Sequence, residues 1–208
     1  AGTVIAPWLQ AQTVADIEKL QRAYGYYADK QQWQDVRDLF TADGVLEPGG
    51  RGRFLGQDHI LEYLRTSLGP IGPVPGTLQD QQQEQGIITV NPDGQSAEGR
   101  WSAFVVAASE WSDVTYENDF AKEDGVWKIR FLHAPINMSA PVGTGWASNV
   151  VPNTRPESAL PPPDLPPSAL YLSFPSYYNV PFHYPNPVTG RSAPPPDPAA
   201  GGAAFGKH

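Results

Sequence analysis

The chain has 208 residues, and its 22 acidic and 14 basic side chains give a net charge of −8 at pH 7. This balance, with no basic run, argues against a nucleic-acid-binding protein, because phosphate binding needs clustered Lys and Arg. The absence of cysteine excludes disulfides, thiolate metal sites and a cysteine nucleophile. No apolar run approaches the roughly 20 residues needed to cross a bilayer, so we expect no membrane partner.

Proline usage divides the chain near residue 150. Residues 150–208 hold 15 of the 23 prolines and only six charged side chains. We therefore expect a folded domain over residues 1–149 and a Pro-rich tail over residues 150–208. Disordered linkers are usually poor in aromatic residues. The aromatic residues of the tail therefore favour an extended segment that docks on its own domain or on a neighbouring subunit. Six of them lie within residues 168–190: Tyr171, Phe174, Tyr177, Tyr178, Phe182 and Tyr184.

The chain begins AGTVIAPW, without an initial methionine. We interpret this start as a sign of processing, by removal of an export signal or by cutting of a longer chain. Because cysteine is absent, the sequence leaves the redox compartment open. A cytoplasmic location is favoured, with the periplasm as the alternative.

The spacing of apolar residues predicts three helices in the first third of the chain. Ile17, Leu20, Tyr24 and Tyr27 lie on one stripe of a helix. We expect the sequence ADG at residues 42–44 to end a second, short helix, before an interrupted strand. The predicted helices cover residues 17–27, 33–40 and 57–68.

From Leu78 onward the period of the apolar residues changes to 2, which indicates long strands. A turn at residues 91–94, Asn-Pro-Asp-Gly, separates the first two strands, and we expect the last strand to end at His133. The predicted strands cover residues 86–90, 96–108, 114–122 and 126–133. Three helices followed by an antiparallel meander predict the α+β class, with the helices packed on one curved sheet as a cone.

Four segments, in this order, resemble the SnoaL-like branch of the nuclear transport factor 2-like superfamily. They are AYGYYADKQQWQDVRDLFTADGVLE, GRGRFLGQDHILEYL, GQSAEGRW and YENDFAKEDGVWKI, and the resemblance as a whole covers about residues 16–133. The resemblance implies a cone-shaped fold of three helices on a curved, mostly antiparallel sheet, in a homodimer or homotrimer. We expect the tail to make contacts between the subunits of that assembly.

The tail segment PFHYPNPVTG resembles a narrower subgroup that includes the sphingomonad diarylpropane γ-formaldehyde lyases. By this resemblance, the substrate is a small lignin-derived aromatic dimer, a 1,2-diarylpropane-1,3-diol, which loses water and formaldehyde to give a stilbene. The superfamily also contains dehydratases, ketosteroid isomerases, polyketide cyclases and domains without catalysis, so the fold does not fix the function. Two alternatives stay open: a dehydratase or isomerase of another hydroxylated aromatic or polycyclic substrate, and a non-catalytic ligand-binding or assembly domain.

Two tyrosines on the predicted helical stripe, Tyr24 and Tyr27, are candidate catalytic residues. If they point into the cone, their hydroxyls can bind or protonate a substrate oxygen. By its spacing to Asp29, Tyr24 resembles the oxyanion-binding tyrosine of the ketosteroid isomerases. The structural alternative is that both are core residues whose hydroxyls reach the cone mouth or a backbone carbonyl. Tyr26 lies off the stripe and is expected to face elsewhere.

His133 is the candidate base. Strand alternation puts Trp127, Ile129, Phe131 and His133 on one face, so we expect a buried Ile129 to place His133 on the concave side. The alternative is a structural histidine near the strand end.

Glu47 precedes a proline, as the catalytic carboxylate of the ketosteroid isomerases does, but it lies one residue short of that position. A shift of one residue turns a strand side chain to the opposite face, which argues against that role.

Further side chains are expected to bind the substrate. Asn118 should share the cone interior with Tyr116 and Phe120, and Arg100 is a candidate for binding an anionic or phenolic group. Gln81 stands where related dehydratases often have a histidine, and its amide can bind oxygens but cannot transfer a proton. A solvated strand face or an interface contact is the structural alternative for these polar residues. The remaining candidates are Trp101, Phe104 and Trp111, as walls of an apolar slot, and His183, carried by the tail.

The resemblance to the diarylpropane lyases, together with these candidate residues, implies a carbon–carbon lyase without cofactor or metal. The four histidines have no metal-ligand spacing, and no phosphate-binding or serine-hydrolase motif is present. The reaction needs an acid, for which Tyr24 or Tyr27 is the candidate, and a base, for which His133 is the candidate. A phenolate on the substrate can push electrons out through a quinone methide, which is why a cofactor is not required.

Overall fold

The computed structural model describes residues 5–107, 109–147, 149–150, 161–169 and 171–192. These residues contain three helices: α1 (Pro7–Asp29), α2 (Trp33–Asp38) and α3 (Gly56–Ser67). They also form one seven-stranded sheet: β1 (Phe40–Pro48), β2 (Phe54–Leu55), β3 (Gln79–Val90), β4 (Ser96–Ala107), β5 (Glu110–Glu123), β6 (Val126–Ala134) and β7 (Ile136–Pro141). The predicted α+β class is therefore confirmed.

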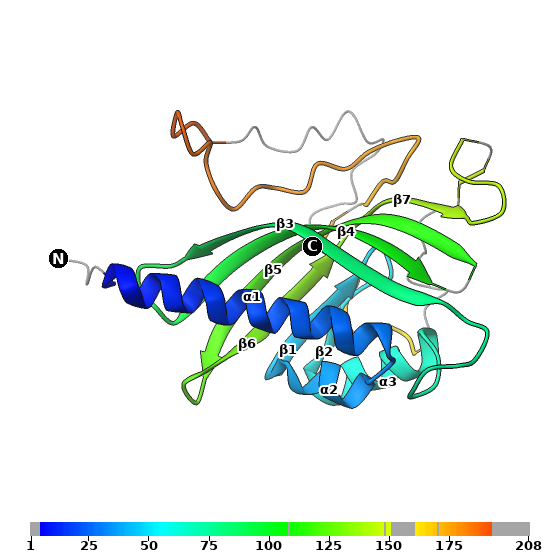
Figure 1. Ribbon diagram of the computed structural model, residues 1–208, viewed down its shortest axis with the longest axis horizontal. Helices are drawn as coiled ribbons and strands as arrows, with labels where there is room; N and C mark the ends of the chain where they lie inside the picture. Colours follow the sequence, from blue (N-terminus) through cyan, green and yellow to red (C-terminus); the bar gives the residue numbers. More distant parts are fainter. Residues whose placement is uncertain (1–4, 108, 148, 151–160, 170, 193–208) are drawn as a thin grey trace.

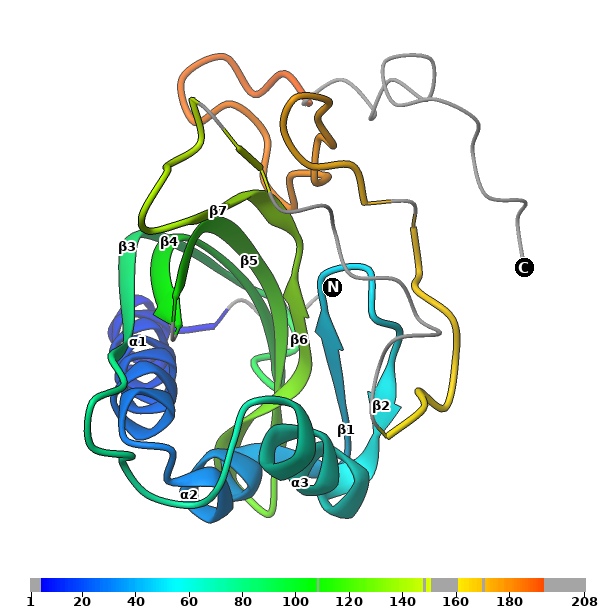
Figure 2. The ribbon, with the colours of Figure 1, turned by 90° about the vertical axis from the view of Figure 1, so that its right-hand side faces the viewer.

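The strand order is β2-β1-β6-β5-β4-β3, with β7 beside β5. Neighbouring strands are antiparallel except β1 and β6, which are parallel, so the sheet is mixed. Figure 2 shows the sheet curving over α1, while α2 and α3 close the lower side. In Figure 1, α1 lies below the sheet and the tail lies above it, so helices and tail cover opposite faces. The predicted cone of three helices on one curved, mostly antiparallel sheet is confirmed.

Helix α1 packs its predicted stripe against the sheet. It begins at Pro7, where a missing N–H group costs nothing because the first turn has no intrahelical acceptor for it. Ile17, Gln21 and Tyr24 are buried, whereas Tyr26, which lies off the stripe, is 73% exposed. No helix in the described part of the chain is both long and apolar enough to span a bilayer.

Several element boundaries differ from the sequence prediction: α1 begins at Pro7, before residue 17, and β3 begins at Gln79, before residue 86. Helix α2 ends at Asp38, before residues 42–44, because Phe40 already pairs with Ile129 of β6. Strand β7 follows β6 and pairs with β5, so β6 is not the last strand, as the sequence had suggested. The sequence of β7, INMSAP, alternates apolar and polar residues up to Ala140, as a strand does, so the sequence prediction stopped one strand too early.

The hydrophobic core lies between the sheet and the three helices. Trp33, Phe40, Phe54 and Ile129 are fully buried, and the ring of Phe54 stacks on Tyr63 with centroids 4.2 Å apart. Burying each such side chain contributes about 1.5–3 kcal/mol relative to leaving it in water. These contacts fix α2 and α3 against β1, β2 and β6, and so hold the ends of β1 and β6 in place.

Strand β6 contains a bulge at Arg130. Two adjacent residues of β5 pair with residues of β6 that lie two apart, so Arg130 is an extra residue in the ladder. Ile129 and Leu132 are both fully buried although they lie three residues apart, because the bulge reverses the alternation of the strand. The expectation that His133 shares the concave face with Ile129 is therefore wrong. His133 lies on the face that the tail covers.

The described part of the tail extends over the face of the sheet opposite α1 (Figure 1). Its first residues hold the β2 region: the backbone N–H of Arg53 donates to the Leu165 carbonyl at 2.9 Å, and that of Leu55 donates to the Asp164 carboxylate at 2.8 Å. Residues 174–177, further along, are exposed. The tail thus lies against its own domain through backbone and side-chain hydrogen bonds.

Candidate active site

Glu47, Tyr171 and His133 form a hydrogen-bonded cluster between the sheet and the tail. The parallel pairing of β1 with β6 places Glu47 directly beside His133. Glu47 is fully buried, and its Oε1 accepts hydrogen bonds from the Tyr171 hydroxyl at 2.8 Å and from the Ser168 backbone N–H at 2.7 Å. The Tyr171 hydroxyl also bonds to Nε2 of His133. A carboxylate, a phenol and an imidazole are thereby connected in one row.

The protons in this row can be placed from the donors available. The phenol of Tyr171 donates its single proton to Glu47, so Nε2 of His133 donates to the Tyr171 oxygen and the lone pair of the ring is on Nδ1. Burial lowers the pKa of His133, against the raising effect of Glu47, Glu117 and Asp119, so the ring is neutral at pH 7. Burial, and then the Glu47 charge, raise the pKa of Tyr171 and keep the phenol protonated.

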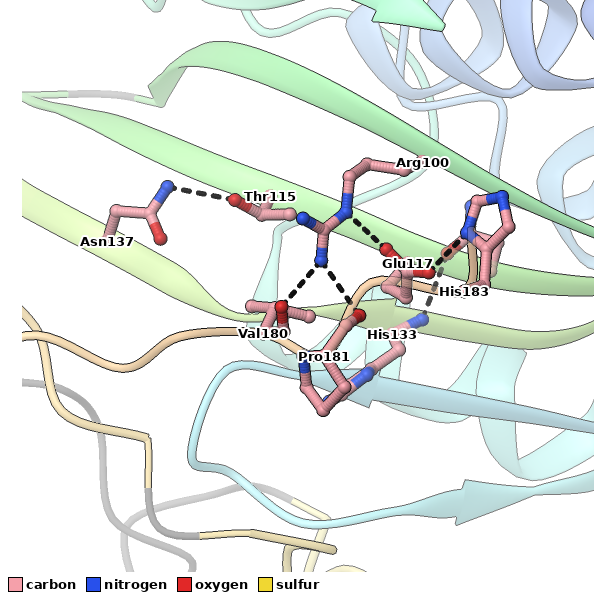
Figure 3. Close-up of polar contacts among 9 residues, drawn as sticks. Arg100, Thr115, Glu117, His133, Asn137, Val180, Pro181 and His183 are labelled. Atoms are coloured by element: carbon pink, nitrogen blue, oxygen red, sulfur yellow. Dashed lines mark hydrogen bonds and ion pairs between the residues drawn. The ribbon is translucent and has the colours of Figure 1, made fainter. Parts of the chain in front are cut away.

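A second cluster on the same face holds the later part of the tail. Arg100 of β4 and Glu117 of β5 are paired across the sheet and form an ion pair through Nε of the guanidinium. The other end of the guanidinium donates to the carbonyl oxygens of residues 180 and 181, at 2.8 and 2.9 Å (Figure 3). Nδ1 of His183 lies 2.5 Å from the Glu117 carboxylate. We refer to Arg100, Glu117 and His183 as the tail anchor.

The opposite face of the sheet, inside the cone, carries neutral polar groups. The rings of Tyr24 and Tyr116 meet edge to face at 6.0 Å, and the Tyr116 hydroxyl donates to Oε1 of Gln81 at 3.1 Å. Asn118 is 1% exposed and donates to Oε1 of Gln21 at 2.9 Å, so its predicted facing is correct. Burial raises the pKa of Tyr24 to about 12, so this phenol stays protonated near neutral pH.

The structure separates the acid and base that the sequence had paired. Tyr24 lies inside the cone against Tyr116, whereas His133 lies under the tail against Tyr171. The sheet stands between them, so Tyr24 and His133 do not meet at one substrate molecule. The physical cause is the bulge at Arg130, which turns His133 away from the cone.

The other predicted site residues are also divided between the two faces. Trp101 packs on Phe120 in the cone, with ring centroids 5.9 Å apart. Phe104 and Trp111 contact each other at 5.3 Å on the other face, so the three do not wall one slot. Tyr27 is half-buried against the core, and Gln81 lies in the cone. Arg100 and His183 belong to the tail anchor.

Sequence reasoning missed two members of the cluster. It placed Glu47 on the face away from the cone, which is correct, but it did not show that the tail covers this face. The aromatic composition of the tail was the only signal for Tyr171, whose partner Glu47 lies 124 residues earlier in the chain. Nothing local in either segment identifies the contact.

Two surface pockets, of about 510 and 400 Å³, lie away from this cluster. The first lies beside α3 and the second along α1 and β3, and neither is lined by Glu47, Tyr171 or His133. Both are open and bordered by solvated polar groups, so the hydrogen-bonded geometry of the cluster is the better guide to the site. Within the described ranges, three or more metal-ligating side chains do not gather anywhere.

The folded part of the chain matches one known family. A family model for the SnoaL-like domain covers residues 10–133, more than half of the chain. The protein therefore belongs to the SnoaL-like family, as the resemblance in the sequence implied. The matched region ends at His133, so Tyr171 and His183 of the tail lie beyond it.

Solved structures share this fold. A candidate scytalone dehydratase from Novosphingobium aromaticivorans is 15% identical over 74% of this chain and 98% of its own, with a TM-score of 0.58. The hexachlorocyclohexane dehydrochlorinase LinA-type3 from Novosphingobium barchaimii is 16% identical over 66% and 94%, with a TM-score of 0.57. ActVI-ORFA from Streptomyces coelicolor is 14% identical over 60% and 98%, with a TM-score of 0.51. At such identities the likeness shows the fold. No curated protein matches the sequence.

Proposed function

We propose that the protein is a cofactor-independent carbon–carbon lyase that acts on a phenolic 1,2-diarylpropane-1,3-diol, a lignin-derived aromatic dimer. The observation that carries the proposal is the Tyr171 hydroxyl, hydrogen-bonded to the Glu47 carboxylate on one side and to the His133 imidazole on the other. Tyr171 comes from the tail, whose segment PFHYPNPVTG resembles the diarylpropane lyases. The substrate class follows from that resemblance, and the proton-transfer chemistry follows from the cluster.

In the proposed reaction the substrate receives one proton, on its α-hydroxyl, and gives up one proton, from its γ-hydroxyl. In the phenolate form of the substrate, the hydroxyl on Cα receives a proton and leaves as water, and the electrons of the phenolate oxygen form a neutral quinone methide. A base then removes the proton of the γ-hydroxyl, and its O–H electrons form the C=O bond of formaldehyde. The Cβ–Cγ bond breaks, and its electron pair forms the Cα=Cβ double bond and restores the aromatic ring. Atoms and electrons balance without an oxidant or a reductant.

Tyr171 and His133 fit the two proton-transfer roles. Neutral His133 accepts the γ-hydroxyl proton, because its lowered pKa leaves the ring unprotonated at pH 7. Tyr171 donates toward the leaving hydroxyl. His133, once it has taken the γ-hydroxyl proton on Nδ1, returns its Nε2 proton to the Tyr171 oxygen, and Glu47 accepts the hydrogen bond of the restored phenol. The cluster is therefore reset in each turnover. Proton transfers of this kind contribute about 10²–10⁴-fold to a rate.

The tail closes the cluster, so part of the tail must move when the substrate enters. Tyr171 is 4% exposed, whereas residues 174–177, which lead from it to the tail anchor, are exposed. Phe131 stacks on His133 at 5.3 Å, and Tyr178 meets Tyr171 at 5.1 Å. These partly exposed rings form an aromatic rim on which the two rings of a diarylpropane can pack.

The test is an incubation of the purified protein with a panel of phenolic diarylpropane diols and related lignin dimers, with no cofactor or metal added. Stilbene absorbance and trapped formaldehyde are followed together, and we expect equal amounts of both. The matched control is the same diol with its phenol methylated, which cannot form a quinone methide and is expected to be inert. Stilbene without formaldehyde, or turnover of the methylated diol, would contradict the mechanism. No turnover by a folded protein would contradict the substrate class.

A dehydratase acting inside the cone is the second candidate. Tyr24 and Tyr116 are buried phenols there, and burial raises the pKa of Asp29, whose Oδ1 accepts the Gln81 backbone N–H at 2.7 Å. Two structural neighbours are named as a dehydratase and a dehydrochlorinase. A reaction in the cone would depend on Tyr24 and Asp29 and would release no formaldehyde, so the same assay separates the two candidates.

A further inference from the structure

A chain of side-chain amides crosses the cone and ends on the backbone of His133. Nε2 of Gln21 donates to Oε1 of Gln83 at 2.9 Å. Oε1 of Gln21 accepts from Nδ2 of Asn118, also at 2.9 Å. Oδ1 of Asn118 accepts from the backbone N–H of His133 at 3.1 Å. The chain connects β3, α1, β5 and β6 in that order.

The direction of every hydrogen bond in this chain follows from its last member. A backbone N–H can only donate, so Asn118 must present its oxygen to His133 and its nitrogen to Gln21. Gln21 must then present its nitrogen to Gln83. Gln21 is 0% exposed and Asn118 is 1% exposed, so water does not offer these amides an alternative partner. The chain of amides therefore has one consistent orientation of its hydrogen bonds.

The chain reaches β6 at the place where the regular ladder is lost. The pairing of β5 with β6 ends at Phe131, just past the bulge at Arg130, and the His133 N–H lies beyond it. The Asn118 side chain takes the place of a ladder carbonyl there. A bulge bends a strand and increases its local twist. Strand β1 pairs with His133 on one side, and on the β5 side this hydrogen bond helps to fix the direction in which His133 points.

We propose that Asn118 and Gln21 are positioning residues for His133, holding its ring in line with Tyr171 from the opposite face of the sheet. The kinetic part of this inference rests on the proposed function. The positional part does not, because any role of His133 depends on the same hydrogen bond to its backbone. Both amides face the cone, so their effect on the cluster passes through the backbone of β6.

The test is a proton NMR titration of His133 in the full chain. The chain has four histidines, so each ring signal can be assigned by a His→Gln variant. The variants are Gln21→Met and Asn118→Leu. The matched control is Gln31→Met, which removes another buried amide, bonded to the Leu68 carbonyl and Gln79 instead. The ionisable groups that act on His133 are left intact in all three, namely Glu47, Glu117, Asp119 and Tyr171, and so is Tyr178, whose ring contacts Tyr171.

We expect the His133 midpoint to rise toward 6.5 in Gln21→Met and Asn118→Leu, because a loosened strand admits water to the ring. The His183 signal should not move. In the lyase assay, kcat should fall about 10- to 100-fold in the same two variants. Gln31→Met should keep both the midpoint and kcat. Equal midpoints in all three variants would overturn the inference, whether or not the wild-type protein turns over a diarylpropane.

Discussion

The two faces of the sheet carry different chemistry. The cone face holds neutral amides and phenols that satisfy one another, such as Gln21, Asn118 and Tyr116. The tail face holds the ionisable groups of the two clusters, Glu47, His133, Arg100, Glu117 and His183. A buried amide needs only hydrogen-bond partners, whereas a buried charge needs a compensating group as well. The tail supplies partners to the charged face, so we expect proton transfer there and structural support from the cone.

The largest effect is expected from Glu47→Gln. Glutamine has nearly the same shape as glutamate but cannot accept a proton, so the row loses one end. We expect kcat for stilbene formation to fall about 10³-fold, with an unchanged circular-dichroism spectrum. The control is Glu62→Gln on α3, a carboxylate with its side chain 59% exposed, which should keep wild-type kcat. A wild-type kcat in Glu47→Gln would show that the reaction does not take place on the tail face.

Tyr171→Phe and Tyr24→Phe compare the two faces directly, because each variant deletes one hydroxyl from a buried ring. Tyr171→Phe breaks the row between Glu47 and His133, and we expect kcat to fall about 10²-fold. Tyr24→Phe loses a hydrogen bond with Tyr116 and should lower the free energy of unfolding by about 1 kcal/mol while kcat is kept. Steady-state kinetics and urea unfolding measure both. The reverse pattern would favour the dehydratase in the cone.

The same contrast separates what the sequence could and could not predict. The helical stripe through Ile17 and Tyr24 and the inward facing of Asn118 depend on local periodicity, which a sequence displays directly. The cone and the neutral polar groups inside it were therefore predictable. His133 was placed on the wrong face because a single extra residue, Arg130, reverses the alternation, and nothing in the β6 sequence signals a bulge.

The tail face depends on contacts between segments far apart in the chain. Glu47 and Tyr171 meet only because β1 lies beside β6 and the tail crosses over both. Arg100 was expected in a substrate pocket, yet its Nε donates to Glu117 and one terminal nitrogen donates to two tail carbonyls. A tail without regular secondary structure has no periodicity from which such contacts can be predicted.

Arg100→Met is expected to weaken the attachment of the tail without removing any group from the row. The variant keeps an unbranched apolar stem in place of the arginine stem but loses the ion pair to Glu117 and the hydrogen bonds to the tail. We expect the free energy of unfolding to fall by about 2 kcal/mol and the tail to become more sensitive to limited proteolysis. The matched control is Arg130→Met, whose partner Asp119 lies at 3.0 Å in an exposed pair that should contribute under about 1 kcal/mol. If both variants lost the same free energy of unfolding, the tail anchor would stabilise the protein no more than an exposed ion pair does.

The smallest expected effect is a pH dependence that His133 gives to stability. Burial lowers the pKa of His133 below 6.5 in the folded protein, so the unfolded chain takes up this proton at a higher pH than the folded chain does. The free energy of unfolding therefore gains a contribution from His133 that is complete above about pH 6.5 and is lost as the pH falls through the lowered pKa. In His133→Gln this contribution is absent.

The measurement is the difference in unfolding free energy between the wild type and His133→Gln, from urea titrations across about pH 5 to 7. Taking the difference cancels the titration of the other histidines, and we expect it to grow as the pH rises and then level off. If it shrinks instead, His133 gains a proton on folding, and attraction to the carboxylates Glu47 and Glu117 outweighs burial. His133 would then enter the reaction as an acid, and the base would have to be Glu47.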